Sequence, residues 1–180
     1  MASPLLFALT PYRLHLIPSV MLTSRRDYIL RIIDEVGRLL ARVIFKHRAG
    51  ADQEALETVV QACERLFDLE ADKLFQLTPD QHFAMLVENE PPEVARNKVL
   101  IYAALNTEAG KIYQKMDKRD LARATFLTAL RFTLRAQSEF PAHELPDYTP
   151  NVDELLAALA DQPLDPEIAA LLNATRPPPP

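Results

Sequence analysis

The chain has 180 residues, of which 48% are hydrophobic and 25% charged, and its formal net charge is −5. This length and composition suit one globular domain that buries a core without disulfides or a structural metal. Three glycines against fifteen prolines, without any alternating strand pattern, indicate an all-α fold with proline-initiated turns. The single cysteine, Cys63, excludes an intramolecular disulfide and fits a cytoplasmic protein, and no apolar run reaches the ~18 residues of a membrane span.

The charges alternate in blocks along the chain. Residues 25–48 carry seven basic and three acidic residues, and residues 49–93 carry two and eleven. Residues 94–136 carry nine and three, and residues 137–180 carry one and eight. The alternation predicts neighbouring layers that attract one another, and solvated helix faces would explain it equally well. The negative net charge argues against general binding of nucleic acid.

Residues 1–22 do not share the pattern of the rest of the chain. They are apolar, but Pro4, Pro11 and Pro18 prevent a long helix from passing through them. They lack the basic start and the small-residue cleavage site of a secretory signal. We therefore interpret residues 1–22 as a non-native or dispensable extension, with Met21 as the natural start. A degenerate targeting segment is the alternative.

The first helix is expected to begin at Ser24, as the N-cap, with Asp27 completing a capping box. It should run to about His47 and end at Gly50, and a second helix should start near Asp52. An apolar stripe at intervals of three and four runs along the first helix and consists of Ile29, Ile32, Ile33, Val36, Leu39, Leu40, Val43 and Ile44. On the second helix, Cys63 lies on the apolar side, which predicts a buried and inert thiol.

Thr78 begins the next helix, with a proline at the first helical position and Gln81 completing a capping box. This short helix should end by Asn89, because two prolines follow. Pro92 is expected to begin a long helix that reaches about Met116. After a polar turn at residues 117–120, a further helix should run to about Ser138.

Two short helices, capped by Asn151 and Asp165, are expected near residues 151–161 and 165–174. The chain then ends in four prolines. In total the sequence predicts about six to seven helices. They are organised as a helical domain over residues 23–138, a cap of short helices over residues 139–174, and a proline tail over residues 175–180.

Small, aromatic and alanine residues recur within residues 103–136 at the spacing typical of a tetratricopeptide repeat, and they are Ala109, Gly110, Tyr113, Ala122, Phe126 and Ala129. The segment resembles such a repeat, with Asn106 where the family usually has tryptophan. The resemblance implies a short stack of antiparallel helical hairpins, a right-handed α-solenoid, in which Gly110 and Ala122 face each other at a close crossing. A generic helical hairpin is the alternative.

The second helix has residues at the spacing of Ala122, Phe126 and Ala129, namely Ala55, Val59 and Ala62. The first two helices therefore resemble a degenerate repeat. The opening of the first helix, the turn at residues 50–56, the capping box at Thr78 and the later repeat also resemble an uncharacterised bacterial family of small repeat-containing cytoplasmic proteins. That resemblance covers residues 23–136. It implies a bacterial, cytoplasmic protein and no assigned activity.

No motif for binding nucleotides or metals, or for covalent catalysis, occurs in the chain. The four histidines are scattered singly, without the spacing of metal ligands. We therefore expect no catalytic residues, no cofactor and no metal site.

The leading hypothesis is a protein-binding module whose groove holds a peptide or a partner helix. On the repeat register, the groove-facing positions of the long helix are Ala104, Thr107, Glu108, Lys111, Gln114 and Lys115. Lys111 and Lys115 would face an acidic peptide, a C-terminal carboxylate, or an internal carboxylate. An open groove would favour this hypothesis.

Two alternatives remain at this stage. One is a structural protein that forms homodimers through the apolar first helix, which an exposed apolar face on that helix would favour. The other is an enzyme with an unrecognised site, which a closed pocket with convergent buried polar groups would favour.

Overall fold

The computed structural model describes residues 19–160 and 163–175, with side chains from residue 25 onwards. Within these residues it has eight α-helices and no strand, so the all-α prediction is confirmed, with one helix more than expected. The extra helix is α3, a single turn too short to show a periodic pattern. The helices are α1 (Ser19–Arg48), α2 (Asp52–Phe67), α3 (Ala71–Leu74), α4 (Pro79–Val87), α5 (Pro92–Lys115), α6 (Arg119–Glu139), α7 (Val152–Ala158) and α8 (Pro166–Thr175).

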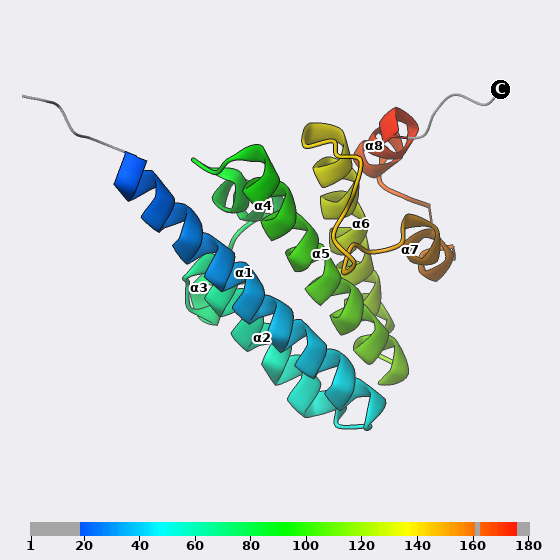
Figure 1. The fold of residues 1–180 in the computed structure, drawn as a ribbon. Coiled ribbons are helices and arrows are strands. Elements are labelled where there is room, and N and C mark those ends of the chain that lie inside the picture. Colours follow the sequence, from blue (N-terminus) through cyan, green and yellow to red (C-terminus); the bar gives the residue numbers. More distant parts are fainter. Residues whose placement is uncertain (1–18, 161–162, 176–180) are drawn as a thin grey trace, which may run out of the picture.

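Two antiparallel helical hairpins lie side by side. The first consists of α1 and α2 and the second of α5 and α6 (Figure 1). Helix α5 packs against both helices of the first hairpin and runs in the same direction as α1, while α7 and α8 pack on α6. Stacked hairpins are therefore present, and the right-handed superhelix implied by the repeat resemblance stays a prediction.

Most of the predicted helix ends are confirmed by their local chemistry. Gly50 has a φ of 81° directly after α1, a conformation that glycine adopts without steric cost. Thr78 and Gln81 form both hydrogen bonds of the predicted capping box. The side chain of Asn151 accepts hydrogen bonds from the backbone N–H groups of Asp153 and Glu154 at the start of α7.

The predicted start of the first helix is wrong. Helix α1 already begins at Ser19, so Ser24 has a helical backbone and cannot act as an N-cap, which requires a non-helical one. Nothing between Ser19 and Ser24 breaks a helix, and serine is tolerated inside one. The described helix therefore extends into the segment assigned to the extension. Residues 1–18 of that extension and residues 176–180 of the proline tail lie outside the described residues.

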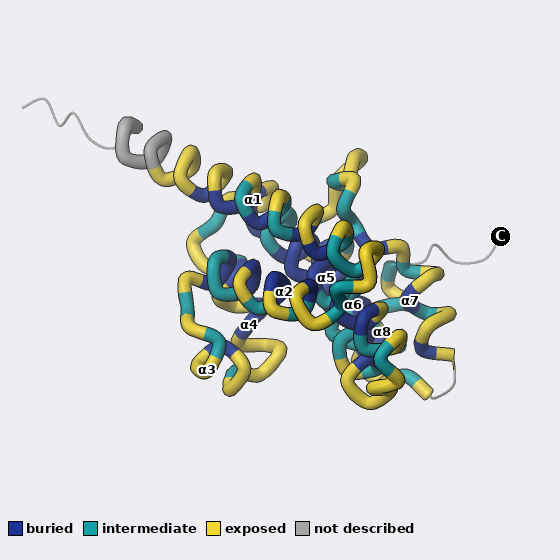
Figure 2. The backbone as a smooth tube through the Cα atoms, turned by 90° about the horizontal axis from the view of Figure 1, so that it is seen from below, coloured by how far each residue is buried: buried dark blue, intermediate teal, exposed yellow. Residues whose placement is uncertain are grey.

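The core has two clusters of buried side chains. The larger one lies among helices α1 to α5 and includes Phe132 and Ala136 of α6. The smaller one joins α6 to α7 and α8 through residues such as Phe126, Leu155 and Ile168. Tyr113 packs against both clusters. The apolar stripe of α1 faces the larger cluster, and its buried residues recur along the helix (Figure 2). The first helix therefore uses this stripe inside the chain.

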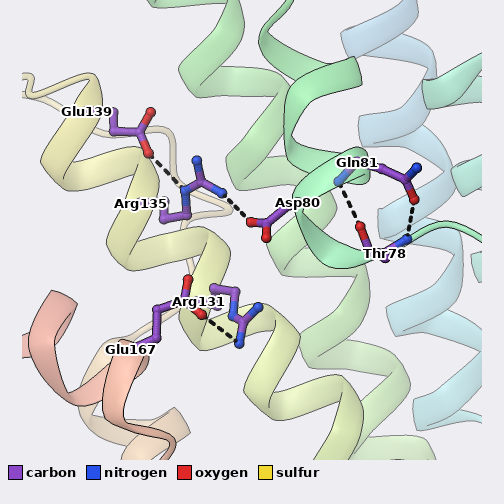
Figure 3. A network of polar contacts seen from close by, with 7 residues as sticks. All are labelled: Thr78, Asp80, Gln81, Arg131, Arg135, Glu139 and Glu167. Atoms are coloured by element: carbon purple, nitrogen blue, oxygen red, sulfur yellow. Dashed lines mark hydrogen bonds and ion pairs between the residues drawn. The ribbon is translucent and has the colours of Figure 1, made fainter.

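Ion pairs link the charge blocks across the helices. Arg135 on α6 donates hydrogen bonds to Asp80 on α4 at 3.2 Å and to Glu139 on its own helix at 2.8 Å (Figure 3). One turn earlier, Arg131 lies 3.2 Å from the carboxylate of Glu167 on α8. Both arginines belong to the basic block 94–136, and Asp80 and Glu167 to the acidic blocks that flank it. These ion pairs provide the attraction between layers that the alternating charge blocks predicted.

Gly110 allows α5 and α6 to approach closely, but its nearest neighbour is Phe126 and not the expected Ala122. A Cβ atom built on Gly110 would lie 2.5 Å from the Phe126 ring, closer than real contacts allow. Ala122 is buried one turn earlier on α6, in the cluster with α7 and α8. The repeat spacing correctly identified Gly110 as the small residue at a close crossing, but the residue packed against it is Phe126.

We expect Gly110→Ala to lower the free energy of unfolding by about 1–3 kcal/mol, because the buried Phe126 ring must move. Gly37→Ala is the matched control, since its Cβ would meet nothing closer than 4.0 Å, at Ile101. That control should stabilise the chain by about 0.5–1 kcal/mol, as alanine does in a helix interior. Urea unfolding measures both, and equal effects of the two substitutions would contradict a close crossing at Gly110.

Candidate functional site

A groove lies between α1 and α5, where the predicted binding positions Ala104, Thr107, Glu108 and Lys111 line a cavity of about 320 Å³. Its other walls are formed by α1, the segment 147–151 and the start of α7. We call it the α1–α5 groove. The side chains from these walls are Leu40, Ile44, Asp147, Tyr148, Thr149, Pro150, Asn151 and Glu154.

The wall opposite α1 exists because the chain after α6 cannot form a helix. Three prolines interrupt residues 141–150, and this segment passes back along α5 (Figure 1). The Tyr148 hydroxyl donates a hydrogen bond to the backbone oxygen of Asn97 on α5 at 3.4 Å, and its ring packs on the larger core cluster. Burial raises the pKa of Tyr148 to about 12, so it stays a neutral donor. The segment is thereby attached to α5.

The groove has an apolar floor and a charged rim. Leu40, Ala104 and Pro150 are buried, whereas Lys111, on the rim, is exposed. The Lys111 ammonium lies 2.7 Å from the Glu108 carboxylate, one turn earlier on α5. The Glu108 side chain is only 12% exposed. The rim therefore has an internal ion pair, in which the carboxylate is largely shielded from water.

The structure does not bring all the predicted residues together. Gln114 lines a separate hollow of about 620 Å³, between the α5–α6 turn and the end of α7. Lys115 forms an ion pair of 2.8 Å with Asp52, at the start of α2. The two lysines therefore face different carboxylates of the chain itself, which was one of the possibilities for their anionic partner.

Asp52 also joins the turn between α1 and α2 to the end of α5. One of its carboxylate oxygens lies 2.8 Å from Nδ1 of His47 and 3.1 Å from the Lys115 ammonium. These hydrogen bonds, that of Lys115 foremost, hold the pKa of the Asp52 carboxyl below its ordinary value of 3.8. Lys115 and His47 thus contribute to the position of the groove's walls without lining the groove.

Buried titratable groups gather elsewhere, between α2, α4 and α5. His82 places Nε2 2.8 Å from the backbone oxygen of Leu74 and Nδ1 3.2 Å from the Tyr102 hydroxyl. A carbonyl only accepts, so Nε2 carries the hydrogen and Nδ1 accepts from Tyr102. Cys63 is buried nearby, and burial raises its pKa to about 12, so the predicted inert thiol is supported. Both histidine nitrogens are used within the fold, which makes this cluster structural.

No local sequence pattern predicts this cluster, because His82 and Tyr102 lie twenty positions apart on different helices. Their only sequence signal is a polar residue on the apolar side of each helix.

We expect Asp52→Asn to lower the free energy of unfolding at pH 7, because the amide loses the charge that pairs with Lys115. A lowered carboxyl pKa stabilises the fold above pH 3.8, and this contribution is lost as the pH falls through the lowered value. The two proteins should therefore converge in stability in strong acid. Urea unfolding from pH 7 to pH 2 measures this, with Asp72→Asn, at an exposed position of α3, as the control. A difference that does not depend on pH would contradict the ion pair.

Tyr102→Phe should cost about 1–3 kcal/mol, because it leaves Nδ1 of the buried His82 without a donor. Tyr113→Phe, at a half-buried tyrosine of the same helix, serves as the control and should change stability by less than about 0.5 kcal/mol. Thermal unfolding of both variants measures the difference. Equal stability of Tyr102→Phe and the parent chain would contradict the assigned hydrogen bond.

Within the part of the chain that is described, no group of three or more His, Cys, Asp or Glu side chains is placed to hold a metal ion. None of the described helices has both the length and the apolar composition needed to cross a membrane. Comparisons with protein-family models, with curated proteins and with solved structures gave no match.

Proposed function

We propose that this chain is a non-catalytic protein-binding module, which holds a peptide segment or a partner helix in the α1–α5 groove. The observation that carries the proposal is the lining of the groove. Thr107, Glu108 and Lys111, expected on the binding side from the repeat register, all line the groove beside an apolar floor. A cavity of about 320 Å³ lies at the lower end of the ~300–1,000 Å³ typical of ligand pockets, room for one or two side chains.

The distribution of polar groups favours binding over catalysis. The charged groups of the groove lie on its rim, where they contact an incoming chain without being enclosed around a substrate. The buried pair His82 and Tyr102, in contrast, uses its hydrogen-bonding groups within the fold. An enzyme with an unrecognised site needs convergent polar groups in a closed pocket, so it is the weakest of the three hypotheses.

Self-association through α1 has less support than binding in the groove. The apolar stripe of α1 packs into the core, which leaves Tyr28, Leu30 and Phe45 as its large exposed hydrophobic residues among those described. Leu30 and Phe45 are fifteen positions apart, about 22 Å along a helix axis, so they do not form one patch. Over the described side chains of α1, from Arg25 onwards, a two-fold dimer would therefore find no continuous apolar surface.

We also propose that the partner is a protein or peptide and that the chain is cytoplasmic. Nucleic acid is not favoured as the partner, because the carboxylates of the groove repel phosphate groups. A cytoplasmic location belongs to the proposal and is supported by the unpaired, buried Cys63.

Site-specific photo-cross-linking tests the proposed function. A photo-reactive residue replaces Glu154 or Lys111, both exposed on the groove rim, or Glu57, an exposed residue of α2 outside the groove lining. We expect the two groove positions to capture the same protein in the cells that produce the chain, and Glu57 to capture none.

Capture from Glu57 alone, or equally from all three positions, would rule out the groove as the binding site. A product of twice the chain's mass would support the homodimer instead.

A further inference from the structure

We infer that the partner segment is cationic, placing an apolar side chain on the floor of the α1–α5 groove and arginine or lysine side chains against its rim. This inference rests on the proposed function and names the chemistry of the partner.

The charges that line the groove are predominantly negative. Glu108, Asp147 and Glu154 contribute three carboxylates, and Lys111 contributes the one ammonium group. Helix α1 contributes only apolar side chains to the lining. Asp147 and Glu154 are both exposed, and no ion pair within the described residues joins either of them to a basic side chain. The wall they form therefore keeps its negative charge, which attracts a cationic chain and repels an acidic one.

Glu108 provides a place for a cationic group inside the rim. Its side chain is 12% exposed, and its one ion pair among the described residues is with Lys111. A carboxylate accepts several hydrogen bonds, so one ammonium group leaves part of its capacity unused. The Lys111 side chain is 45% exposed and can move into solvent, because exposed pairs of this kind contribute little to stability. A guanidinium or ammonium group of the partner would take its place or share the carboxylate.

At the helix end that borders the groove, two of the backbone donors that could bind an anion are already used. The N-terminus of α7 lies there, and such ends generally favour anions. The side chain of Asn151, however, already accepts hydrogen bonds from the N–H groups of Asp153 and Glu154, at 2.9 and 3.2 Å. Lys115, the second lysine of the predicted anion site, is held outside the groove by Asp52. A basic partner is therefore favoured over an acidic peptide, which was one of the possibilities that the sequence left open.

Lys111→Ala tests the inference, because the two kinds of partner give effects of opposite sign. If the partner is cationic, the substitution removes the internal competitor for Glu108 and should strengthen binding several-fold. If Lys111 itself holds an acidic partner, the same substitution weakens binding. Lys73→Ala is the matched control, since Lys73 also pairs with a glutamate three positions earlier, Glu70, and lies outside the groove.

The probes are three pools of seven-residue peptides with a central leucine, flanked by Arg and Lys, by Gln and Asn, or by Asp and Glu. Binding to the full chain is measured by fluorescence anisotropy at low and at high salt. The Arg and Lys pool should bind about tenfold tighter than the Gln and Asn pool, and salt should reduce the difference. Asp147→Asn combined with Glu154→Gln should remove most of this preference, because it neutralises two of the three carboxylates.

Tighter binding of the Asp and Glu pool, or weaker binding to Lys111→Ala, would overturn the cationic partner and leave the groove as the binding site. An unchanged preference in the Asp147 and Glu154 variant would overturn it as well. If no pool binds, the inference also fails, whereas the proposed function is judged separately by cross-linking from the groove positions.

Discussion

The middle of α5 is buried on every side, and the positions of the other helices follow from the need to cover it. Seven consecutive residues, Val99 to Leu105, are each at most 5% exposed. A helix that is apolar all round requires neighbours in every direction, and α5 packs against α1, α2, α4 and α6. Its C-terminal part emerges from this enclosure, where Thr107, Glu108 and Lys111 reach the groove. The candidate site lies where the central helix leaves the core.

Thr58, His82 and Thr133, the buried polar residues among those described, all form hydrogen bonds within the fold. His82, on α4, donates a hydrogen bond to the backbone oxygen of Leu74 on α3 from one ring nitrogen. Its other nitrogen accepts a hydrogen bond from Tyr102 on α5. Burial of an unpaired polar group costs free energy, so this arrangement connects the short helices to α5 as well as filling space. The buried thiol of Cys63 is kept protonated by the same environment. His82 and Cys63 therefore contribute to the structure of the core, and the proposed recognition site lies at the surface.

The ion pairs between charge blocks involve basic side chains that do not line the groove. Arg131 and Arg135 bind acidic side chains of α8 and α4, and Lys115 binds Asp52. Each exposed pair contributes little on its own, but together they occupy basic side chains that face the acidic blocks. Asp147, in the segment after α6, and Glu154, on α7, are the acidic residues of the groove wall, which has no basic residue from either element. These two carboxylates form no ion pair among the described residues, so they define the electrostatic character of the proposed binding surface.

The sequence by itself determined the all-α class, most helix ends and the burial of Cys63, because glycine, proline and capping residues act on backbone groups within a few positions and periodicity defines a helix face. It did not determine that Gly110 meets Phe126, that Lys115 pairs with Asp52 sixty-three positions away, or that residues 147–151 close one side of the groove. Only the tertiary structure decided these contacts. These contacts depend on how the packed helices are rotated and offset relative to one another. Side chains from distant segments determine that packing together, so no local sequence pattern predicts it.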